Sequence, residues 1–220
     1  MSGKAPKVVL SNSTLTSAKD IHKWLKQQRS DILNEVKTTR THFVCVVRDG
    51  PLATTAKVLR TLALGKLVVT DDWVTDSQLE GQLLEPNDYV HASLEKSINL
   101  DRSVLFEGQI MFFTRKLVTE YGTGWEDVKD LAKECGAKLV DHGSAALGER
   151  TAGMGDTVFF GAEKDDKDVA ELIRAQHVVY HKDLLAKGVL HGEIDLDSDE
   201  FELQAAAPSV KKSKKALKSV

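Results

Sequence analysis

The chain has 220 residues, of which 41% are hydrophobic and 29% charged, and its 30 Lys and Arg against 33 Asp and Glu give a formal net charge of −3. This composition is that of a globular protein with one large domain or two of about 100 residues, and it excludes a disordered or fibrous chain. The near balance of charge excludes a general polyanion binder of the histone type, so any bound phosphate is expected at a local site.

Two features of the sequence indicate the compartment. No apolar run approaches the roughly 18 residues of a membrane span, and the polar first residues MSGKAPK lack the apolar core of a signal peptide. The two cysteines, Cys45 and Cys135, lie in apolar segments, where a reduced thiol behaves as a small buried hydrophobe. We therefore expect a soluble chain, neither secreted nor attached to a membrane, in the cytosol or the nucleus.

The first half of the chain predicts seven elements in the order β-α-β-β-α-β-α. In the first helix, Ile21, Trp24 and Leu25 recur at helical spacing, and Ser17 is the expected N-cap. Gly65 closes the second helix. In chain order the elements are a strand at 7–11, a helix at 17–28, strands at 31–36 and 41–47, a helix at about 52–64, a strand at 67–70 and a helix at 71–81.

The second half repeats this pattern of elements with longer loops. The distance between matching elements grows from 102 residues at the first strand to 110 at the last. Alternating strands and helices at this spacing favour a small parallel sheet with helices on both faces in each repeat, an α/β architecture. The elements are a strand at 109–114, a helix at 125–135, a strand at 137–141, a Gly-rich loop at 143–155, a strand at 156–160, a helix at 166–175, a strand at 177–180 and a helix at 182–188.

Several segments resemble the BRCT domain, the module named after the carboxyl-terminal region of the breast cancer susceptibility protein. Residues 54–77, TTAKVLRTLALGKLVVTDDWVTDS, are similar to the second helix, fourth strand and third helix of that family, with its signature Trp73. Residues 41–44, THFV, match its third strand, and Gly136-Ala137 match the pair that joins its first helix to its second strand.

Two positions depart from the family's pattern. Residues 29–31, Arg-Ser-Asp, replace the glycine pair of the first repeat, and Asp183 stands where the second repeat would carry its tryptophan. The resemblance covers roughly residues 7 to 203 and implies two tandem BRCT-type domains, each a small parallel four-stranded sheet flanked by helices, packed through a linker. The expected boundaries are repeat 1 at 1–91, the linker at 92–102, repeat 2 at 103–203 and a basic disordered tail at 204–220.

The resemblance also implies a phosphate site in the first repeat, because tandem BRCT pairs often bind phosphorylated Ser or Thr peptides. The family uses a hydroxyl and a backbone N–H at the end of strand one and a Lys near the start of helix two. The matching residues are Ser11, Asn12, in place of the usual Gly, and Lys57. A phosphate is stabilised by charge-assisted hydrogen bonds and by the positive end of a helix. Spacing alone would leave Ser11 a solvated turn residue and Lys57 a surface charge.

A groove between the repeats would select the peptide. The residues that match it are Thr54, Leu59, Thr123 and Trp125, although Leu59 and Trp125 are equally consistent with an interface core. The position of Thr54 carries an Arg in several family members, where it binds the peptide main chain or a free carboxylate. Thr cannot provide that cation, which argues against a phosphorylated protein C-terminus as the ligand.

Other motifs indicate no catalytic chemistry. Residues 143–155 have four glycines but lack the ending of a P-loop, so we expect a flexible connection. His177 and His181 lie in a strand with no third ligand nearby, and no nucleophile or paired carboxylates stand out, so we expect no metal, cofactor or active site. The lysines of the tail could be a nuclear import signal, a weak nucleic-acid contact or a solubilising end: Lys211, Lys212, Lys214 and Lys215 lead this cluster.

The leading hypothesis is a non-enzymatic tandem BRCT module that recognises a phosphorylated Ser or Thr motif of a nuclear protein, in the DNA-damage response or DNA repair. One alternative keeps the fold but makes it a phosphorylation-independent scaffold that clamps an unphosphorylated helix of a constitutive partner. A second is a module that binds DNA ends or 5′-phosphates with help from the basic tail. A small α/β enzyme is the third.

Overall fold

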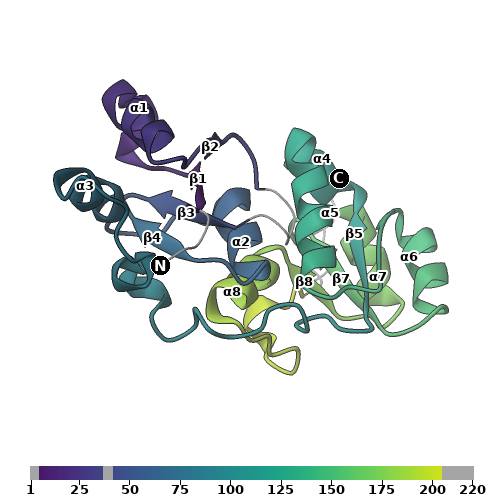
Figure 1. The fold of residues 1–220 in the computed structure, drawn as a ribbon. Helices are drawn as coiled ribbons and strands as arrows, with labels where there is room; N and C mark the ends of the chain where they lie inside the picture. The colour runs from purple at the N-terminus through teal and green to yellow at the C-terminus, as the bar shows by residue number, and fades with distance from the viewer. Residues whose placement is uncertain (1–4, 37–41, 205–220) are drawn as a thin grey trace, which may run out of the picture.

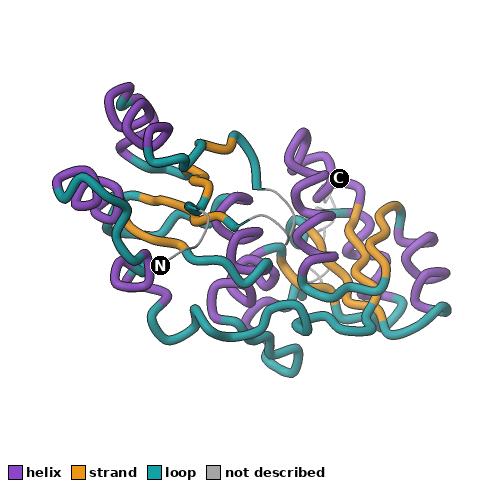
Figure 2. Tube along the Cα trace, viewed as in Figure 1, coloured by secondary structure: helices purple, strands orange, loops and turns teal. Residues whose placement is uncertain are grey.

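Two α/β repeats lie side by side in the computed structural model, which describes residues 5–36 and 42–204 (Figure 1). Each repeat is built on one sheet of four parallel strands. Helices lie on both sides of each sheet (Figure 2). The predicted α/β architecture with two small parallel sheets is confirmed.

The sheet of repeat 1 has the strand order β2-β1-β3-β4. The strands β2 and β3, which follow one another in the sequence, therefore lie on opposite sides of β1. Its central strand β3 is buried along its whole length, as expected for a parallel sheet covered by helices on both faces. The elements are β1 (Lys7–Leu10), η1 (Thr14–Ser17), α1 (Lys19–Gln27), β2 (Ile32–Leu33), β3 (Phe43–Val47), α2 (Ala56–Ala63), β4 (Val68–Thr70), α3 (Asp72–Leu79), η2 (Pro86–Tyr89) and η3 (Ala92–Leu94).

The sheet of repeat 2 has the equivalent order β6-β5-β7-β8. Its central strands β5 and β7 carry an apolar, aromatic-rich sequence that is almost completely buried. The elements are β5 (Ile110–Thr114), α4 (Arg115–Tyr121), η4 (Gly122–Gly124), α5 (Trp125–Glu134), β6 (Leu139–Gly143), α6 (Ala145–Ala152), β7 (Thr157–Gly161), α7 (Lys167–Arg174), β8 (Val179–His181), α8 (Asp183–His191) and η5 (Asp199–Phe201).

Two helices of repeat 1 begin later than the sequence predicted. The predicted N-cap at Ser17 is wrong: Ser17 ends η1, and α1 begins at Lys19 without a side-chain cap. The helix predicted from about residue 52 begins at Ala56, because the Thr55 hydroxyl accepts a hydrogen bond from the backbone N–H of Val58 at 3.2 Å. The residues before Thr55 are therefore a loop between β3 and α2.

Repeat 2 contains two helices that the sequence analysis missed. The expected flexible connection at 143–155 is wrong, since α6 occupies most of it. Gly148 lets α6 approach the sheet closely: a Cβ there would lie only 3.1 Å from the rings of Phe112 and Phe159 and 3.2 Å from Leu172. The lack of a side chain at Gly148 therefore allows α6 to pack closely on the sheet. The other additional helix, α4, follows β5 directly.

Strand register corrects the position equivalent to the signature tryptophan. Val69 and Tyr180 occupy the same place in their sheets, paired with Val46 and Phe160 of the neighbouring strands. Counting from this pair, Leu184 matches Trp73, so the prediction that Asp183 stands there is wrong by one residue.

Both residues at that position are buried core residues. The fully buried Trp73 donates its indole N–H to the carbonyl of Leu84 at 3.0 Å. Leu184 is 3% exposed and fills the same place in repeat 2 with a smaller, entirely apolar side chain, which needs no hydrogen-bond partner.

The two repeats share one continuous core. Helix α2 of repeat 1 packs against α5 and α8 of repeat 2. The buried residues at this junction include Leu59 and Leu62 from α2, Leu131 from α5 and Leu185 from α8, all in one cluster. Burial of a leucine side chain contributes about 1.5 to 3 kcal/mol, so this interface holds the two repeats together as one unit.

An ion network also joins the repeats at this interface. The guanidinium of Arg60 on α2 reaches three acids on α5: Glu134 at 2.7 Å, Asp127 at 3.1 Å and Asp130 at 3.2 Å. Hydrogen bonding to Glu134 raises the pKa of Arg60. Burial, together with the neighbouring Asp130 and Asp127, raises the pKa of Glu134 despite its contacts with Arg60. The contact is therefore costly to break, although the net stability that it adds is small.

The linker is fixed to repeat 2 by Arg102, whose side chain is buried. Its guanidinium donates to the carbonyls of Val189 and Leu190 in the last turn of α8 and to those of Ser97 and Leu100 in the linker itself. A cation is favourable at the carboxyl end of a helix, where the unpaired carbonyls lie. Burial lowers the pKa of Arg102 from its ordinary value.

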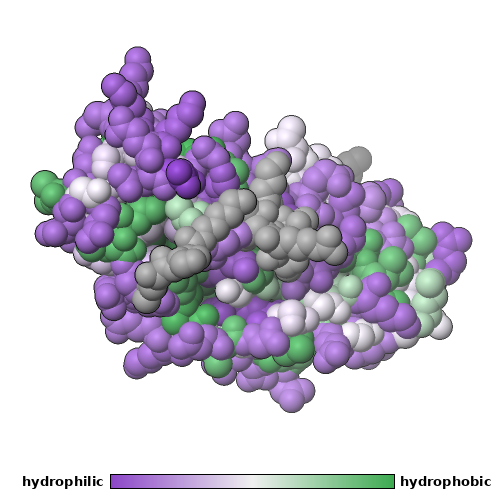
Figure 3. All heavy atoms as spheres, viewed as in Figure 1, coloured by the Kyte–Doolittle hydropathy of each residue, from purple (hydrophilic) through white to green (hydrophobic). Residues whose placement is uncertain are grey.

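The face seen in Figure 3 is mainly hydrophilic and carries smaller, separate hydrophobic areas. The large apolar side chains with high exposure come from different elements, such as Leu79 at the end of α3 and Met154 after α6, and single exposures of this kind are ordinary. No helix in the described part of the chain is long and apolar enough to cross a membrane.

Candidate functional site

Two segments far apart in the sequence meet where β1 ends and α2 begins. The Ser11 hydroxyl lies 2.6 Å from the Thr55 hydroxyl, and the Lys57 ammonium donates to the carbonyl of Leu10 at 3.1 Å. Parallel strands and the helices that follow them bring these groups to the same edge of the sheet. We call Ser11, Asn12, Thr55 and Lys57 the repeat-1 site.

Asn12 forms the turn that follows β1 in this site. Its φ of 52° lies in the left-handed region, which glycine adopts freely and asparagine tolerates better than most other residues. The replacement of the usual Gly by Asn therefore keeps the turn. The carbonyl of Asn12 accepts a hydrogen bond from the backbone N–H of Arg48, at 3.4 Å, which ties the turn to the end of β3.

Thr55 belongs to the site but was missed by the sequence analysis. Its hydroxyl caps α2 and contacts Ser11, so it sets both the start of the helix and the place of the Ser11 side chain. A Thr directly before an apolar helical pattern is an N-cap signal. That signal was lost because the helix was predicted to begin at about residue 52.

An acidic residue also lies close to the repeat-1 site but is already hydrogen-bonded. The carboxylate of Asp71 accepts bonds from the Ser13 hydroxyl at 2.6 Å, from the Thr14 backbone N–H at 2.8 Å and from the Thr14 hydroxyl at 2.6 Å. These bonds hold the chain that follows Asn12. The groups left for a ligand are hydroxyls, a backbone N–H and an ammonium, which suit an oxyanion.

The two cysteines are not placed to act as nucleophiles. Both are fully buried, and burial raises the pKa of each thiol to about 12. A thiol with such a pKa stays protonated near neutral pH and is a poor nucleophile. Within residues 5–36 and 42–204, no group of three or more His, Cys, Asp or Glu is arranged to hold a metal ion.

Repeat 2 has a counterpart of this site with the opposite charge at its centre. Thr114 ends β5 as Ser11 follows β1, and its hydroxyl donates to Asp166, the N-cap of α7, at 2.7 Å. Asp168 is the second residue of α7, as Lys57 is of α2. The cation of repeat 1 is thus replaced by a carboxylate.

The Asp168 carboxylate is fully occupied within the protein. Arg115 donates to it through two nitrogens, at 2.7 and 2.8 Å, and the backbone N–H of Ala145 donates at 3.2 Å. The bonds from Arg115 lower the pKa of Asp168. The counterpart in repeat 2 therefore places a carboxylate where repeat 1 places the Lys57 ammonium, and this negative charge opposes the binding of a phosphate.

Replacing Asp168 by Asn should lower the free energy of unfolding at pH 7 by about 1 to 3 kcal/mol, because a buried charged hydrogen-bond acceptor is lost. The lowered pKa means that this contribution is complete above the ordinary aspartate pKa of about 3.9 and is lost as the pH falls further. Urea unfolding at several pH values measures this, and the difference between wild type and variant should shrink below about pH 4.

The matched control is Asp165→Asn, which removes an exposed carboxylate paired with Lys116. We expect little change there, since exposed ion pairs contribute little. A loss for Asp168→Asn no larger than that of the control would show that the pair with Arg115 does not stabilise repeat 2.

A cleft of about 310 Å³ lies between the repeats beside the repeat-1 site. Thr54 and Leu59 of repeat 1 line it, as do residues of α4, α5 and α8 from repeat 2. The lining residues from repeat 2 were not predicted from the sequence, and they include both apolar and charged side chains. Among them are Tyr121, Val128, Leu131, Lys182, Asp183 and Leu185.

The other two residues predicted for this groove lie elsewhere. Trp125 is only 8% exposed, and its ring packs edge-on against Phe113 in the core of repeat 2. Thr123 is exposed in η4, just before α5, and does not line the cleft. The neighbouring Gly124 does line it.

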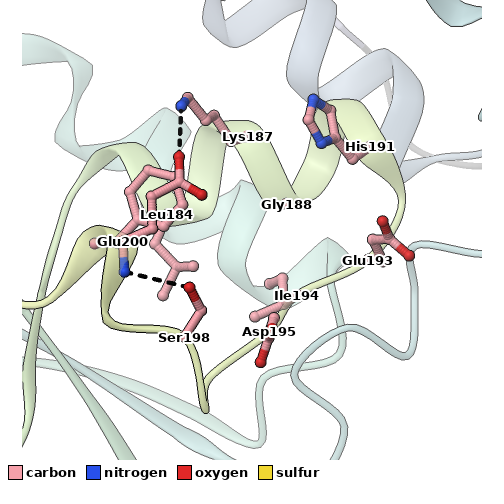
Figure 4. Close-up of a pocket in the computed structure, with 10 residues that line it drawn as sticks. Leu184, Lys187, Gly188, His191, Glu193, Ile194, Asp195, Ser198 and Glu200 are labelled. Atoms are coloured by element: carbon pink, nitrogen blue, oxygen red, sulfur yellow. Dashed lines mark hydrogen bonds and ion pairs between the residues drawn. The ribbon is translucent and has the colours of Figure 1, made fainter.

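A second cavity, of about 350 Å³, lies between α8 and the segment that follows it (Figure 4). Glu193, Asp195 and Glu200 contribute carboxylates to its wall. Lys187 is paired with Glu200 at 3.1 Å and lies over the ring of Phe201. This surface is acidic and does not suit a phosphate.

No protein-family model matches the sequence, and a search of curated proteins found no match. Solved structures are similar over most of the chain. The BRCT5-BRCT6 domains of S. pombe Brc1 share 18% identity with a TM-score of 0.69, over 89% of this chain and 98% of theirs. A crystal structure of Rtt107p shares 15% identity with a TM-score of 0.65, over 90% and 91%.

A complex of Rtt107p with a phosphorylated histone is also similar, at 14% identity and a TM-score of 0.65, over 90% of this chain and 92% of that one. At these identities the comparison concerns the fold. The two parallel sheets, the helices on both sides of them and the coverage of both repeats agree, so the chain has the fold of a tandem pair of BRCT domains.

Proposed function

We propose that this chain is a non-enzymatic module that binds a phosphorylated Ser or Thr motif of a nuclear protein in the DNA-damage response or DNA repair. The observation that carries the proposal is the convergence of Ser11, Asn12 and Lys57 at one edge of repeat 1. At the equivalent edge of repeat 2, Asp168 takes the place of the lysine and is paired with Arg115. At the same position of equivalent helices, repeat 1 thus has a cation and repeat 2 a carboxylate.

In this proposal the phosphate oxygens accept hydrogen bonds from the Ser11 hydroxyl, the Asn12 backbone N–H and the Lys57 ammonium. The amino end of α2, which starts beside Lys57, adds a favourable partial charge. The peptide then continues from the phosphate into the cleft between the repeats, where Leu59 offers an apolar contact and Thr54 a hydroxyl.

The fold supports this choice of ligand class. Rtt107p, whose structure this chain resembles, has been crystallised in a complex with a phosphorylated histone. For the present chain Thr54 supplies no cation to a terminal carboxylate, so we propose an internal phosphorylated motif. Nuclear localisation is part of the proposal, and the lysines proposed for import or weak nucleic-acid contact (Lys211, Lys212, Lys214 and Lys215) lie outside the described residues.

The experiment is fluorescence anisotropy with an oriented library of phosphoserine and phosphothreonine peptides, each measured beside its unphosphorylated twin. We expect micromolar binding that requires the phosphate and a motif selected by the cleft. Equal binding of both twins would overturn the proposal in favour of a phosphorylation-independent scaffold. Binding of DNA ends but of no peptide, with a steep dependence on salt, would favour the nucleic-acid alternative.

A further inference from the structure

Arg48 lies beside the repeat-1 site, although nothing in the sequence indicated it. It follows β3 directly, and its backbone N–H donates to the carbonyl of Asn12 at 3.4 Å. The register of the sheet agrees, because Leu10 is paired with Val46 two residues earlier on each strand. Arg48 therefore stands opposite Asn12, at the edge where Lys57 also lies.

The backbone around Arg48 is held in place while its side chain is exposed. The carbonyl of Gly50, two residues on, accepts a hydrogen bond from the buried ring of His91 at 3.0 Å. Among the described residues, no ion pair or side-chain hydrogen bond engages the Arg48 guanidinium. Its five donors are thus available to a ligand on a fixed loop.

The single positive charge of Lys57 does not balance the charge of a phosphate bound at this edge of the sheet. A phosphorylated side chain carries a charge of about −1.5 to −2 at pH 7, whereas Lys57 supplies a single positive charge. Asp71 adds a negative charge nearby, and Asp49 adds another on the loop itself. Thr54 contributes no cation, and among the described residues Arg48 is an exposed cation next to the Asn12 turn that can complete the compensation.

We propose that Arg48 is a further phosphate-binding residue of the repeat-1 site, and this inference rests on the proposed function. Lys57 approaches the phosphate from α2, and Arg48 approaches it from the end of β3. The planar guanidinium can donate two parallel hydrogen bonds to phosphate oxygens, which an ammonium cannot do. The phosphate is then held by cations from two elements that flank the Asn12 turn.

The test compares Arg48→Gln with Arg29→Gln, both of which remove one exposed arginine charge. Arg29 is a matched control because it lies before β2, at the opposite edge of the same sheet, and also has no partner among the described side chains. The probe is a phosphoserine peptide selected from the library, with its acidic flanking residues replaced by Ala, so that the phosphate is its main anion. Binding is measured by fluorescence anisotropy at two salt concentrations.

We expect Arg48→Gln to weaken binding by about 3- to 10-fold, between the value of an exposed ion pair and that of a buried charged hydrogen bond. Arg48→Lys should retain part of the affinity, and Arg29→Gln should retain all of it. The effect should shrink at high salt, and the unphosphorylated twin should be unaffected. The melting temperature checks that the variants remain folded.

A loss of affinity for Arg48→Gln equal to that for Arg29→Gln would overturn the inference. So would a loss that appears only when acidic flanking residues are present, since Arg48 would then bind the flanks and not the phosphate. If wild type binds the phosphorylated peptide no better than its twin, the proposed function itself fails, and the two failures are thereby distinguished.

Discussion

Replacing Lys57 by Ala should weaken the binding of a phosphorylated peptide by about 10- to 150-fold and leave the unphosphorylated twin unchanged. The range corresponds to the loss of one hydrogen bond to a charged group, about 1.5 to 3 kcal/mol. The Lys57 ammonium donates a hydrogen bond to the carbonyl of Leu10, the residue before Ser11. Removal of the ammonium therefore takes a full positive charge from the centre of the site. Fluorescence anisotropy with the peptide pair measures the effect.

Lys66→Ala is the matched control for this variant. Lys66 precedes β4 and therefore lies at the opposite edge of the same sheet from Lys57. The control removes the same charge from repeat 1 and should leave the affinity unchanged. Undiminished binding by Lys57→Ala would contradict the assignment of the phosphate to the repeat-1 site.

Replacing Arg60 by Ala should lower the free energy of unfolding by about 2 to 4 kcal/mol. The main cause is the carboxylate of Glu134, which is only 14% exposed and would be left without its guanidinium. Asp127 and Asp130 are about half exposed, so water replaces most of their contact with Arg60. Urea unfolding monitored by tryptophan fluorescence measures the loss.

Arg174→Ala is the control for Arg60→Ala, because it removes an exposed helical arginine in the last turn of α7. We expect it to change stability by less than about 0.5 kcal/mol. Phosphopeptide affinity should fall for Arg60→Ala as well, since the cleft needs both repeats in place. An unfolding curve of Arg60→Ala that matches that of Arg174→Ala would show that the network does not couple the repeats.

The two repeats have the same fold but differ in the charge of a few side chains at equivalent positions. Lys57 and Asp168 occupy the same position of equivalent helices, and Ser11 and Thr114 lie at the carboxyl ends of equivalent strands. In repeat 2 the carboxylate is paired within the chain by Arg115. This difference is the reason why we place the proposed phosphate site in repeat 1 and not at the equivalent position of repeat 2.

Much of the fold could be predicted from the sequence because its core strands are short, continuous apolar runs. The segments around Val44 and Phe112 have no polar face, which is the pattern of a strand buried between helices. Repetition of the pattern then indicated two equivalent domains. The positions of Ser11 and Lys57 came from the family resemblance, since their spacing alone is common on protein surfaces.

The remaining features depend on contacts between residues distant in sequence. Helix α6 was missed because Gly148 is unfavourable in an isolated helix and is required only by the rings beneath it. Thr55 and Arg48 gain their places from strand register and from the helix start, neither of which is fixed by local propensity. The one-residue error at Asp183 had the same origin, because only register shows that Leu184 fills the core position.

The most direct test of the central claim is a heteronuclear NMR titration of the isotope-labelled chain with a phosphorylated peptide and with its unphosphorylated twin. The account predicts that the phosphorylated peptide shifts the backbone amide signals of Ser11, Asn12 and Lys57, while the twin does not. Equal shifts from both peptides, or phosphate-dependent shifts confined to Thr114 and Asp168 in repeat 2, would contradict it.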